Sequence, residues 1–160
     1  MTFRTRHSAW LALLALATPL AAQSPQESAA AKAEVFSVVR RLFDGMRAKD
    51  TTAMRATLDT GATLQSVGPA GLRKTAITNW LRGVASAPDS VTLDERIANE
   101  RVYVDGGLAM VWVDYWFFRN ERFSHCGVDA FLLARGAGGW KIFALADTRR
   151  TEGCASPPAR

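Results

Sequence analysis

The chain has 160 residues, of which 48% are apolar, as is typical of one globular domain with a proper hydrophobic core. It carries 20 basic and 15 acidic residues, a formal net charge of +5, and its arginines are scattered along the sequence. A nucleic-acid-binding surface needs a concentrated basic face, so the composition argues against a nucleic-acid partner.

The first 22 residues have the pattern of a secretory signal peptide. Arg4 and Arg6 form a basic start, an apolar run follows over 10–17, and two alanines at the end suit cleavage. The run is too short to span a bilayer as a helix, and no cysteine lies near the cleavage point to carry a lipid. We therefore expect a secreted or periplasmic protein with no stable membrane anchor. Cleavage would lower the net charge from +5 to +3, because it removes two arginines and no acidic residue.

The rest of the chain divides into three parts. Residues 23–31 are polar and alanine-rich, and we interpret them as a flexible leader. Residues 32–154 form the single expected domain. Residues 155–160 follow the last predicted strand, and we interpret them as a disordered tail.

The first half of the domain has helical patterns. Apolar residues recur at helical spacing over 34–48, which predicts a first helix. Asp50 can cap a second, short helix that runs through Leu58. Residues 62–67 alternate like a short strand, and 75–85 show the spacing of a third helix.

The second half has strand patterns separated by turn residues. The expected turns lie at 105–107, 120–121 and 136–139. They separate four predicted strands over 93–104, 108–118, 123–133 and 140–148. Helices followed by strands predict an α+β fold, with three N-terminal helices packed on a strongly curved antiparallel sheet.

Two cysteines, Cys126 and Cys154, are present. In an oxidising compartment they can form a disulfide that ties the tail to the sheet, and the alternative is two unpaired thiols. We expect no metal site, because the cysteines and His125 lack close ligand spacing.

The hairpin turns predict which side chains share a face. If residues 120–121 form a two-residue loop, His125 lies opposite Trp116 and Asp129 lies opposite Trp112. Asp114 falls on the same face. The neighbouring hairpins would add five more residues to it, which are Asn99, Arg101, Tyr103, Thr148 and Arg150.

We expect this polar and aromatic face, and not the opposite apolar one, to line a cavity. His125 is the candidate general acid or base, because its ordinary pKa lies near neutrality, with Asp129 or Asp114 to orient it or to transfer a proton. The candidate ligand-binding residues are Trp112, Trp116, Arg101, Tyr103 and Asn99. Each of these residues also has a purely structural interpretation, as a core side chain or an ion-pair partner.

Three segments carry a family resemblance, at residues 42–50, 104–112 and 139–142. They resemble the NTF2-like superfamily, also called SnoaL-like. The segments at 125–131 and 147–150 are similar to its branch labelled "putative lumazine-binding". The resemblance covers about residues 32–154 and implies a cone-shaped fold around one cavity, commonly in a homodimer. The superfamily includes isomerases, cyclases and dehydratases, but their acid–base residues cannot be matched to positions here.

Three functions follow as expectations. The first is binding of a small apolar or heteroaromatic molecule in the cone cavity. The second is a cofactor-free isomerase, cyclase or dehydratase that uses His125 with Asp129 or Asp114. The third is a dimeric scaffold without a ligand. No cofactor is expected for any of them.

Overall fold

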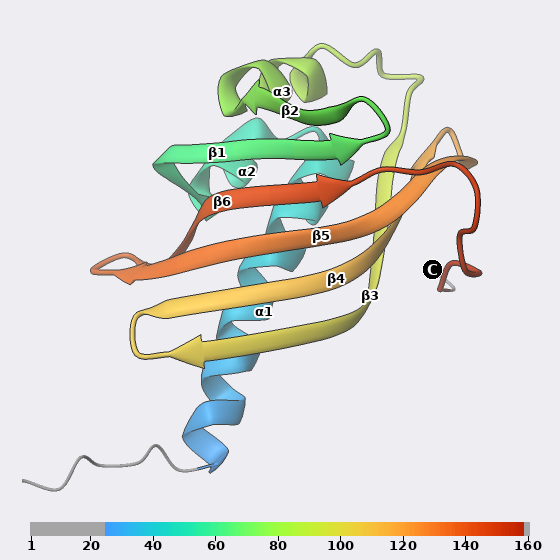
Figure 1. Ribbon diagram of the computed structural model, residues 1–160. Coiled ribbons are helices and arrows are strands. Elements are labelled where there is room, and N and C mark those ends of the chain that lie inside the picture. The colour runs from blue at the N-terminus through green and yellow to red at the C-terminus, as the bar shows by residue number, and fades with distance from the viewer. Residues whose placement is uncertain (1–24, 159–160) are drawn as a thin grey trace, which may run out of the picture.

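The computed structural model describes residues 25–158, so the expected signal peptide lies outside the described residues. In this part of the chain three helices accompany a six-stranded sheet (Figure 1). The helices are α1 (Pro25–Ala48), α2 (Thr51–Thr57) and α3 (Ile77–Ala85). The strands are β1 (Leu58–Gly68), β2 (Gly71–Ala76), β3 (Leu93–Asp105), β4 (Leu108–Arg119), β5 (Arg122–Gly136) and β6 (Gly139–Thr148). The expected α+β class is confirmed.

Helix α1 crosses the sheet and supplies much of the core (Figure 1). It begins at Pro25, so it includes residues 25–31 of the segment expected to be a flexible leader. Proline is well tolerated in the first helical turn, and the alanines that follow are strong helix formers. The predicted apolar stripe is buried, with Val35, Val39, Leu42, Phe43 and Met46 all in the core. Within residues 25–158, no helix is long and apolar enough to cross a membrane.

Helix α2 begins as predicted, after Asp50. The carboxylate of Asp50 accepts hydrogen bonds from the backbone N–H groups of Thr52, at 3.0 Å, and Ala53, at 2.9 Å. These bonds satisfy two amides that the first helical turn leaves without partners.

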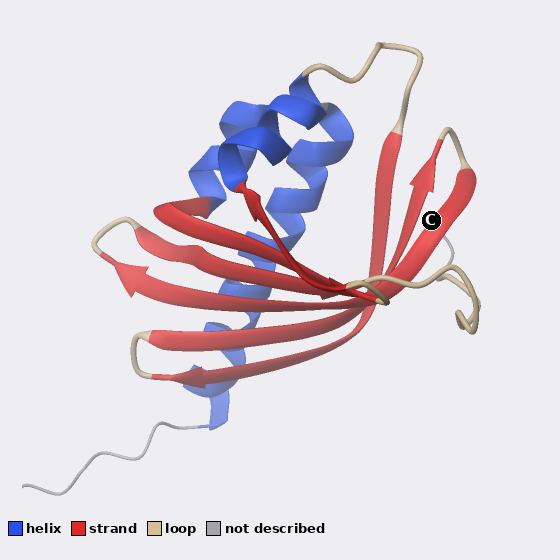
Figure 2. Cartoon of the chain, turned by 45° about the horizontal axis from the view of Figure 1, so that its top comes forward, coloured by secondary structure: helices blue, strands red, loops and turns tan. Residues whose placement is uncertain are grey.

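The sheet is mixed, with the strand order β2-β1-β6-β5-β4-β3. Strand β1 runs parallel to β6, and β2 is a strand that the sequence analysis missed, so the expected purely antiparallel sheet is wrong. The sheet as a whole is not strongly curled, which corrects the expected strong curvature, and its long strands bend near one end (Figure 2). Strand β2 is short and exposed at the sheet edge, so its side chains lack a clear alternation of apolar and polar residues.

A β-bulge at the start of β5 changes the register between β4 and β5. The two-residue turn at Asn120-Glu121 forms as predicted, and both of its residues adopt positive φ angles. Beyond the turn, however, Ser124 has no partner on β4, and His125 pairs with Phe117 instead of Trp116. One extra residue moves every later side chain of β5 to the other face relative to β4.

Two further irregularities have the same effect. In β3 the register shifts between Ala98 and Arg101, where Asn99 adopts a φ of 57°. In β6 the turn register holds, with Arg135 opposite Trp140, but the ladder shifts by one residue beyond Leu133. The inner face, which meets the helices, consequently carries side chains that simple alternation would have placed outside.

The outer face carries the remaining side chains, several of them apolar and exposed. Tyr103 is 56% exposed, Trp112 40% and Leu132 38%. An apolar patch of this kind is a candidate protein contact. It supports the expected homodimer, which stays a prediction.

The expected disulfide between Cys126 and Cys154 is present, with the two Cα atoms 6.1 Å apart. It holds the segment after β6 against the outer face, where Trp116 and Phe118 pack with Cys126. The indole N–H of Trp116 donates to the carbonyl of Ala155 at 2.7 Å, so the chain is anchored into the segment expected to be a disordered tail. The β6 end is therefore fixed over β5.

Gly127 permits this close approach. A Cβ atom built on Gly127 would lie 1.9 Å from the carbonyl oxygen of Thr148 and 2.7 Å from the ring of Tyr115. Both neighbours are constrained, because the Tyr115 hydroxyl donates to that same carbonyl at 2.8 Å.

We therefore predict that Gly127→Ala lowers the free energy of unfolding by more than about 3 kcal/mol, since the added methyl group must displace backbone. Urea unfolding measures the change. Gly138→Ala is the matched control, because a Cβ there meets nothing within 4 Å, and it should leave stability nearly unchanged. Equal stability of the two variants would contradict the close packing of β5 against the end of β6.

Candidate functional site

A cavity of about 330 Å³ lies between the inner face of the sheet and the helices. Most of its wall is apolar and aromatic, whereas its polar groups come from β1, β2, β3, β5 and the end of β6. The apolar wall comprises Phe43, Met46, Leu64, Trp80, Val84, Leu93, Phe117 and Leu145. The polar groups are Ser66, Arg73, Thr75, Glu95, His125, Asp129, Asp147 and Arg149. An apolar pocket with a few placed polar groups is typical of a small-molecule site.

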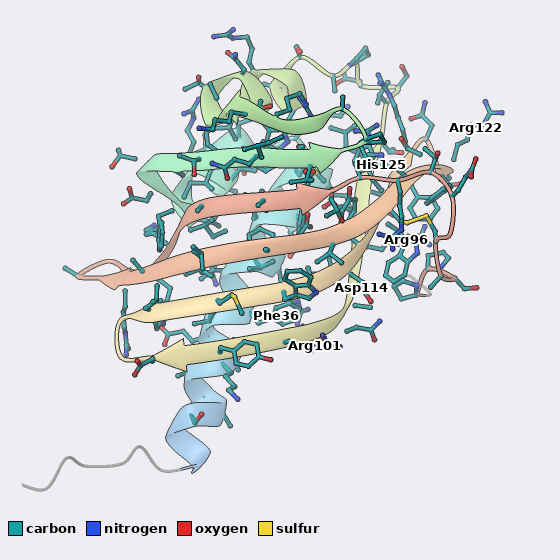
Figure 3. The ribbon with its side chains drawn as sticks, viewed as in Figure 1. Phe36, Arg96, Arg101, Asp114, Arg122 and His125 are labelled. Carbon is teal, nitrogen blue, oxygen red and sulfur yellow. A yellow bond between two sulfur atoms is a disulfide. The ribbon has the colours of Figure 1, made fainter. Side chains whose placement is uncertain are left out.

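His125 lines this cavity near the bulge in β5 (Figure 3). The residue is 7% exposed and lies between two aromatic rings, 5.6 Å from Tyr115 and 5.1 Å from Phe117 between ring centroids. Its Nδ1 lies 3.0 Å from the Ser124 hydroxyl. Burial, assisted by the charge of Arg149, lowers the pKa of His125 to about 4. His125 is therefore neutral near pH 7.

Three carboxyl groups face the same cavity. Asp129 is 3% exposed and lies directly opposite Asp147 in the β5–β6 ladder. Its side chain also shares a hydrogen bond with Glu95 of β3. Two carboxyl groups in contact away from water cannot both ionise easily, so Asp129 and Glu95 share a proton.

The pKa values of this pair reflect their burial. Burial raises the pKa of Asp129 well above its usual value, and the negative charge of Glu95 adds to the effect. Burial likewise raises the pKa of Glu95 to about 7, against the opposing hydrogen bond from Asp129. Glu95 therefore titrates in the range where acid–base chemistry at neutral pH operates.

Two oxygens of this carboxyl group cluster have no hydrogen-bond partner among the described residues. They are Oδ2 of Asp129 and Oδ1 of Asp147, and both are buried. Buried polar atoms nearly always have a partner, so these two oxygens are unused hydrogen-bond acceptors on residues that line the cavity.

The structure separates the residues that the sequence analysis had grouped. His125 and Asp129 lie together in the cavity, whereas Asp114 lies on the outer face, where its carboxylate accepts a hydrogen bond from Asn99 at 2.9 Å. Asp114 therefore cannot assist His125. The expectation of one shared face is wrong because of the bulge at Ser124.

The other expected ligand-binding residues also lie away from this cavity. Trp112 and Tyr103 are exposed on the outer face, and Trp116 packs near the disulfide. Arg101 and Tyr103 line a separate surface groove beside the N-terminal half of α1. Thr148 and Arg150 were expected on the His125 face, but the shift in β6 gives their places to Asp147 and Arg149.

Sequence reasoning missed Glu95 and Asp147 as site residues. Strict alternation from the β3–β4 turn would place Arg96 opposite Phe117. The register shift near Asn99 places Glu95 there instead. The one available signal was Asn99 itself, since asparagine tolerates positive φ better than most residues.

The α+β fold, with a cavity between its sheet and its helices, is that of an NTF2-like protein. A model of the family described as "Putative lumazine-binding" matches residues 30–145, and the chain belongs to this family. The resemblance noted in the sequence is therefore confirmed. A search of the curated proteins finds no match.

Solved structures show the same fold at low sequence identity. An NTF2-like protein of unknown function from Shewanella baltica is 15% identical, with a TM-score of 0.60 over 82% of this chain and 100% of its own. A protein described as a "putative dehydratase" of the NTF2-like family, from Streptomyces avermitilis, is 14% identical, with a TM-score of 0.61 over 77% and 98%. An NTF2-like protein from Pseudomonas putida is 18% identical, with a TM-score of 0.62 over 79% and 91%.

We predict that His125 stays neutral down to about pH 5. Its folded pKa of about 4 lies below the ordinary value of 6.5, so protonation is delayed until well below that value. NMR of the chain without residues 1–22 measures this directly, because His125 is then its only histidine. A histidine-containing peptide in the same sample should titrate normally. A His125 midpoint near 6.5 would show that the imidazole is solvated.

We also predict that Glu95→Gln becomes increasingly stabilising as pH rises. The folded pKa of Glu95, about 7, lies above its usual 4.5, so the stability that its protonated form contributes is lost between these pH values. The variant has no such loss, and its advantage over the wild type should grow by on the order of 1–3 kcal/mol between pH 4.5 and 8.

Urea unfolding at several pH values tests this difference. Glu100→Gln, at an exposed position of the same strand, is the matched control and should show a constant difference from the wild type. A constant difference for Glu95→Gln as well would mean that Glu95 ionises normally in the folded protein.

Proposed function

We propose that this protein binds a small, planar, largely apolar or heteroaromatic molecule in the cavity. One observation carries the proposal, which is that a cavity with an apolar and partly aromatic wall is lined by two residues whose buried carboxyl oxygens lack partners. The apolar wall would exclude water from the body of the ligand, and the few polar groups would fix its orientation. The family description, which names lumazine binding, supports the same class of molecule.

We further propose that the protein does so outside the cytoplasm. The basic and apolar pattern at the start of the sequence supports export. The disulfide between Cys126 and Cys154 is compatible with an oxidising compartment.

A proton-transfer function is the second candidate. Glu95 and Asp129 share a proton, and the pKa of Glu95, about 7, suits a general acid or base near neutral pH. A cofactor-free isomerisation or dehydration would need such a pair beside the neutral imidazole of His125, and one structural neighbour is described as a "putative dehydratase". Asp129→Asn separates binding from catalysis. If the protein is a proton-transfer enzyme, the variant should lose turnover while a probe still enters the cavity.

The dimeric scaffold without a ligand is the least supported function. It would require a cavity filled by the protein's own side chains, whereas about 330 Å³ is open here.

The binding proposal predicts that indole and lumazine enter the cavity beside Trp80. In two-dimensional ¹H–¹⁵N NMR spectra each indole N–H gives its own signal, and both probes should shift the Trp80 signal in a saturable way. Trp112 lies on the outer face and is the internal control, since its signal should stay in place. Trp80→Phe and Trp112→Phe assign the two signals. If neither probe moves the Trp80 signal, or if only Trp112 responds, the proposed site is wrong.

A further inference from the structure

We propose that the natural occupant of the cavity is an organic cation, a planar molecule whose protonated nitrogen donates hydrogen bonds to Asp129 and Asp147. This inference rests on the proposed binding function and names the chemical class of its ligand. The amidine and arylalkylamine groups have the required chemistry.

The first argument is the position of the two free acceptors. Asp129 and Asp147 lie directly opposite each other on β5 and β6, where facing side chains have Cβ atoms about 5 Å apart. Oδ2 of Asp129 and Oδ1 of Asp147 are both buried, and both lack a hydrogen-bond partner among residues 25–158. A nitrogen with two or more N–H groups, placed between the strands, could donate to both oxygens.

The second argument is charge. In the part of the chain that the structure describes, neither Asp129 nor Asp147 forms an ion pair. Glu95 adds a third carboxyl group in contact with Asp129, so the buried end of the cavity carries negative charge even when one proton is shared. A buried charge is costly unless it is paired, and a cationic ligand would supply the missing partner.

The arginines of the cavity do not fill this role. Arg73 and Arg149 are both exposed, so their guanidinium groups keep contact with water. Arg73 also donates to two neutral hydroxyl groups, those of Thr75 at 3.1 Å and Ser66 at 3.3 Å. Water already solvates these arginines, so an anionic ligand would gain little by pairing with them. The cavity groups that are shielded from water are the carboxyl groups, which favour a cation.

A metal ion fits the site less well than an organic cation. No group of three potential ligands among the described residues is arranged to hold a metal ion, and that includes this carboxyl cluster. The aromatic side chains of Trp80 and Phe117 line the same cavity and suit a flat organic body. Aromatic faces also attract organic cations directly.

The test compares three probes of nearly equal shape and different charge. They are benzamidine, which is cationic, benzamide, which is neutral, and benzoate, which is anionic. Each is titrated into the mature protein at pH 7.5, with the Trp80 indole signal as the readout. We expect benzamidine to bind at least about tenfold more tightly than benzamide, as one added charge-assisted hydrogen bond implies, and benzoate to bind most weakly.

Three isosteric variants locate the interaction. Asp129→Asn and Asp147→Asn should each weaken benzamidine binding about tenfold and change benzamide binding by less than about twofold. Asp114→Asn, on the outer face, should change neither. Thermal unfolding checks that each variant folds, and the two cavity variants are separate tests, so failure of one to fold leaves the other as the test.

The outcomes distinguish this inference from the proposed function. Equal affinity for benzamidine and benzamide, or tighter binding of benzoate, would overturn the organic-cation inference and leave small-molecule binding intact. The same holds if indole moves the Trp80 signal and benzamidine does not. If no probe moves that signal, both proposals fail.

Discussion

Three β-bulges determine which polar side chains reach the inner face of the sheet and line the cavity. The bulge at Ser124 turns His125 and Asp129 toward the helices, the irregularity near Asn99 selects Glu95 instead of Arg96, and the shift in β6 selects Asp147. A bulge adds one residue, and one residue is enough to exchange the two faces of a strand. Without these three shifts the carboxyl groups would not meet in one cavity.

The carboxyl cluster is costly for the folded protein. Asp129 and Glu95 lose hydration on burial and repel each other, and a shared proton relieves only part of this cost. The apolar packing of α1 against β3, β4 and β6 must offset the remainder. This arrangement suits the proposed ligand, which donates hydrogen bonds and carries positive charge.

Close packing of the end of β6 over the same part of β5 supports this pocket. Gly127 lets the end of β6 lie close over the ring of Tyr115, and the disulfide between Cys126 and Cys154 holds the following segment in place. The inner face thus presents His125 and Asp129 to the cavity, while the neighbouring Cys126 fixes the outer face. Because side chains alternate along β5, the cavity residues lie on its inner face and the disulfide cysteine lies on its outer face.

The sequence by itself determined the α+β class, the capped helix after Asp50, the hairpin turns, the cysteine pair and the family, because these depend on local preference and periodicity. It also named His125 and Asp129 as candidates, and both line the cavity. Only the tertiary structure decided their partners, replacing Asp114 with Glu95 and Asp147 and moving Trp112 and Trp116 outside. The reason is physical, since a bulge changes strand pairing by one residue and leaves almost no trace in the pattern of apolar and polar residues.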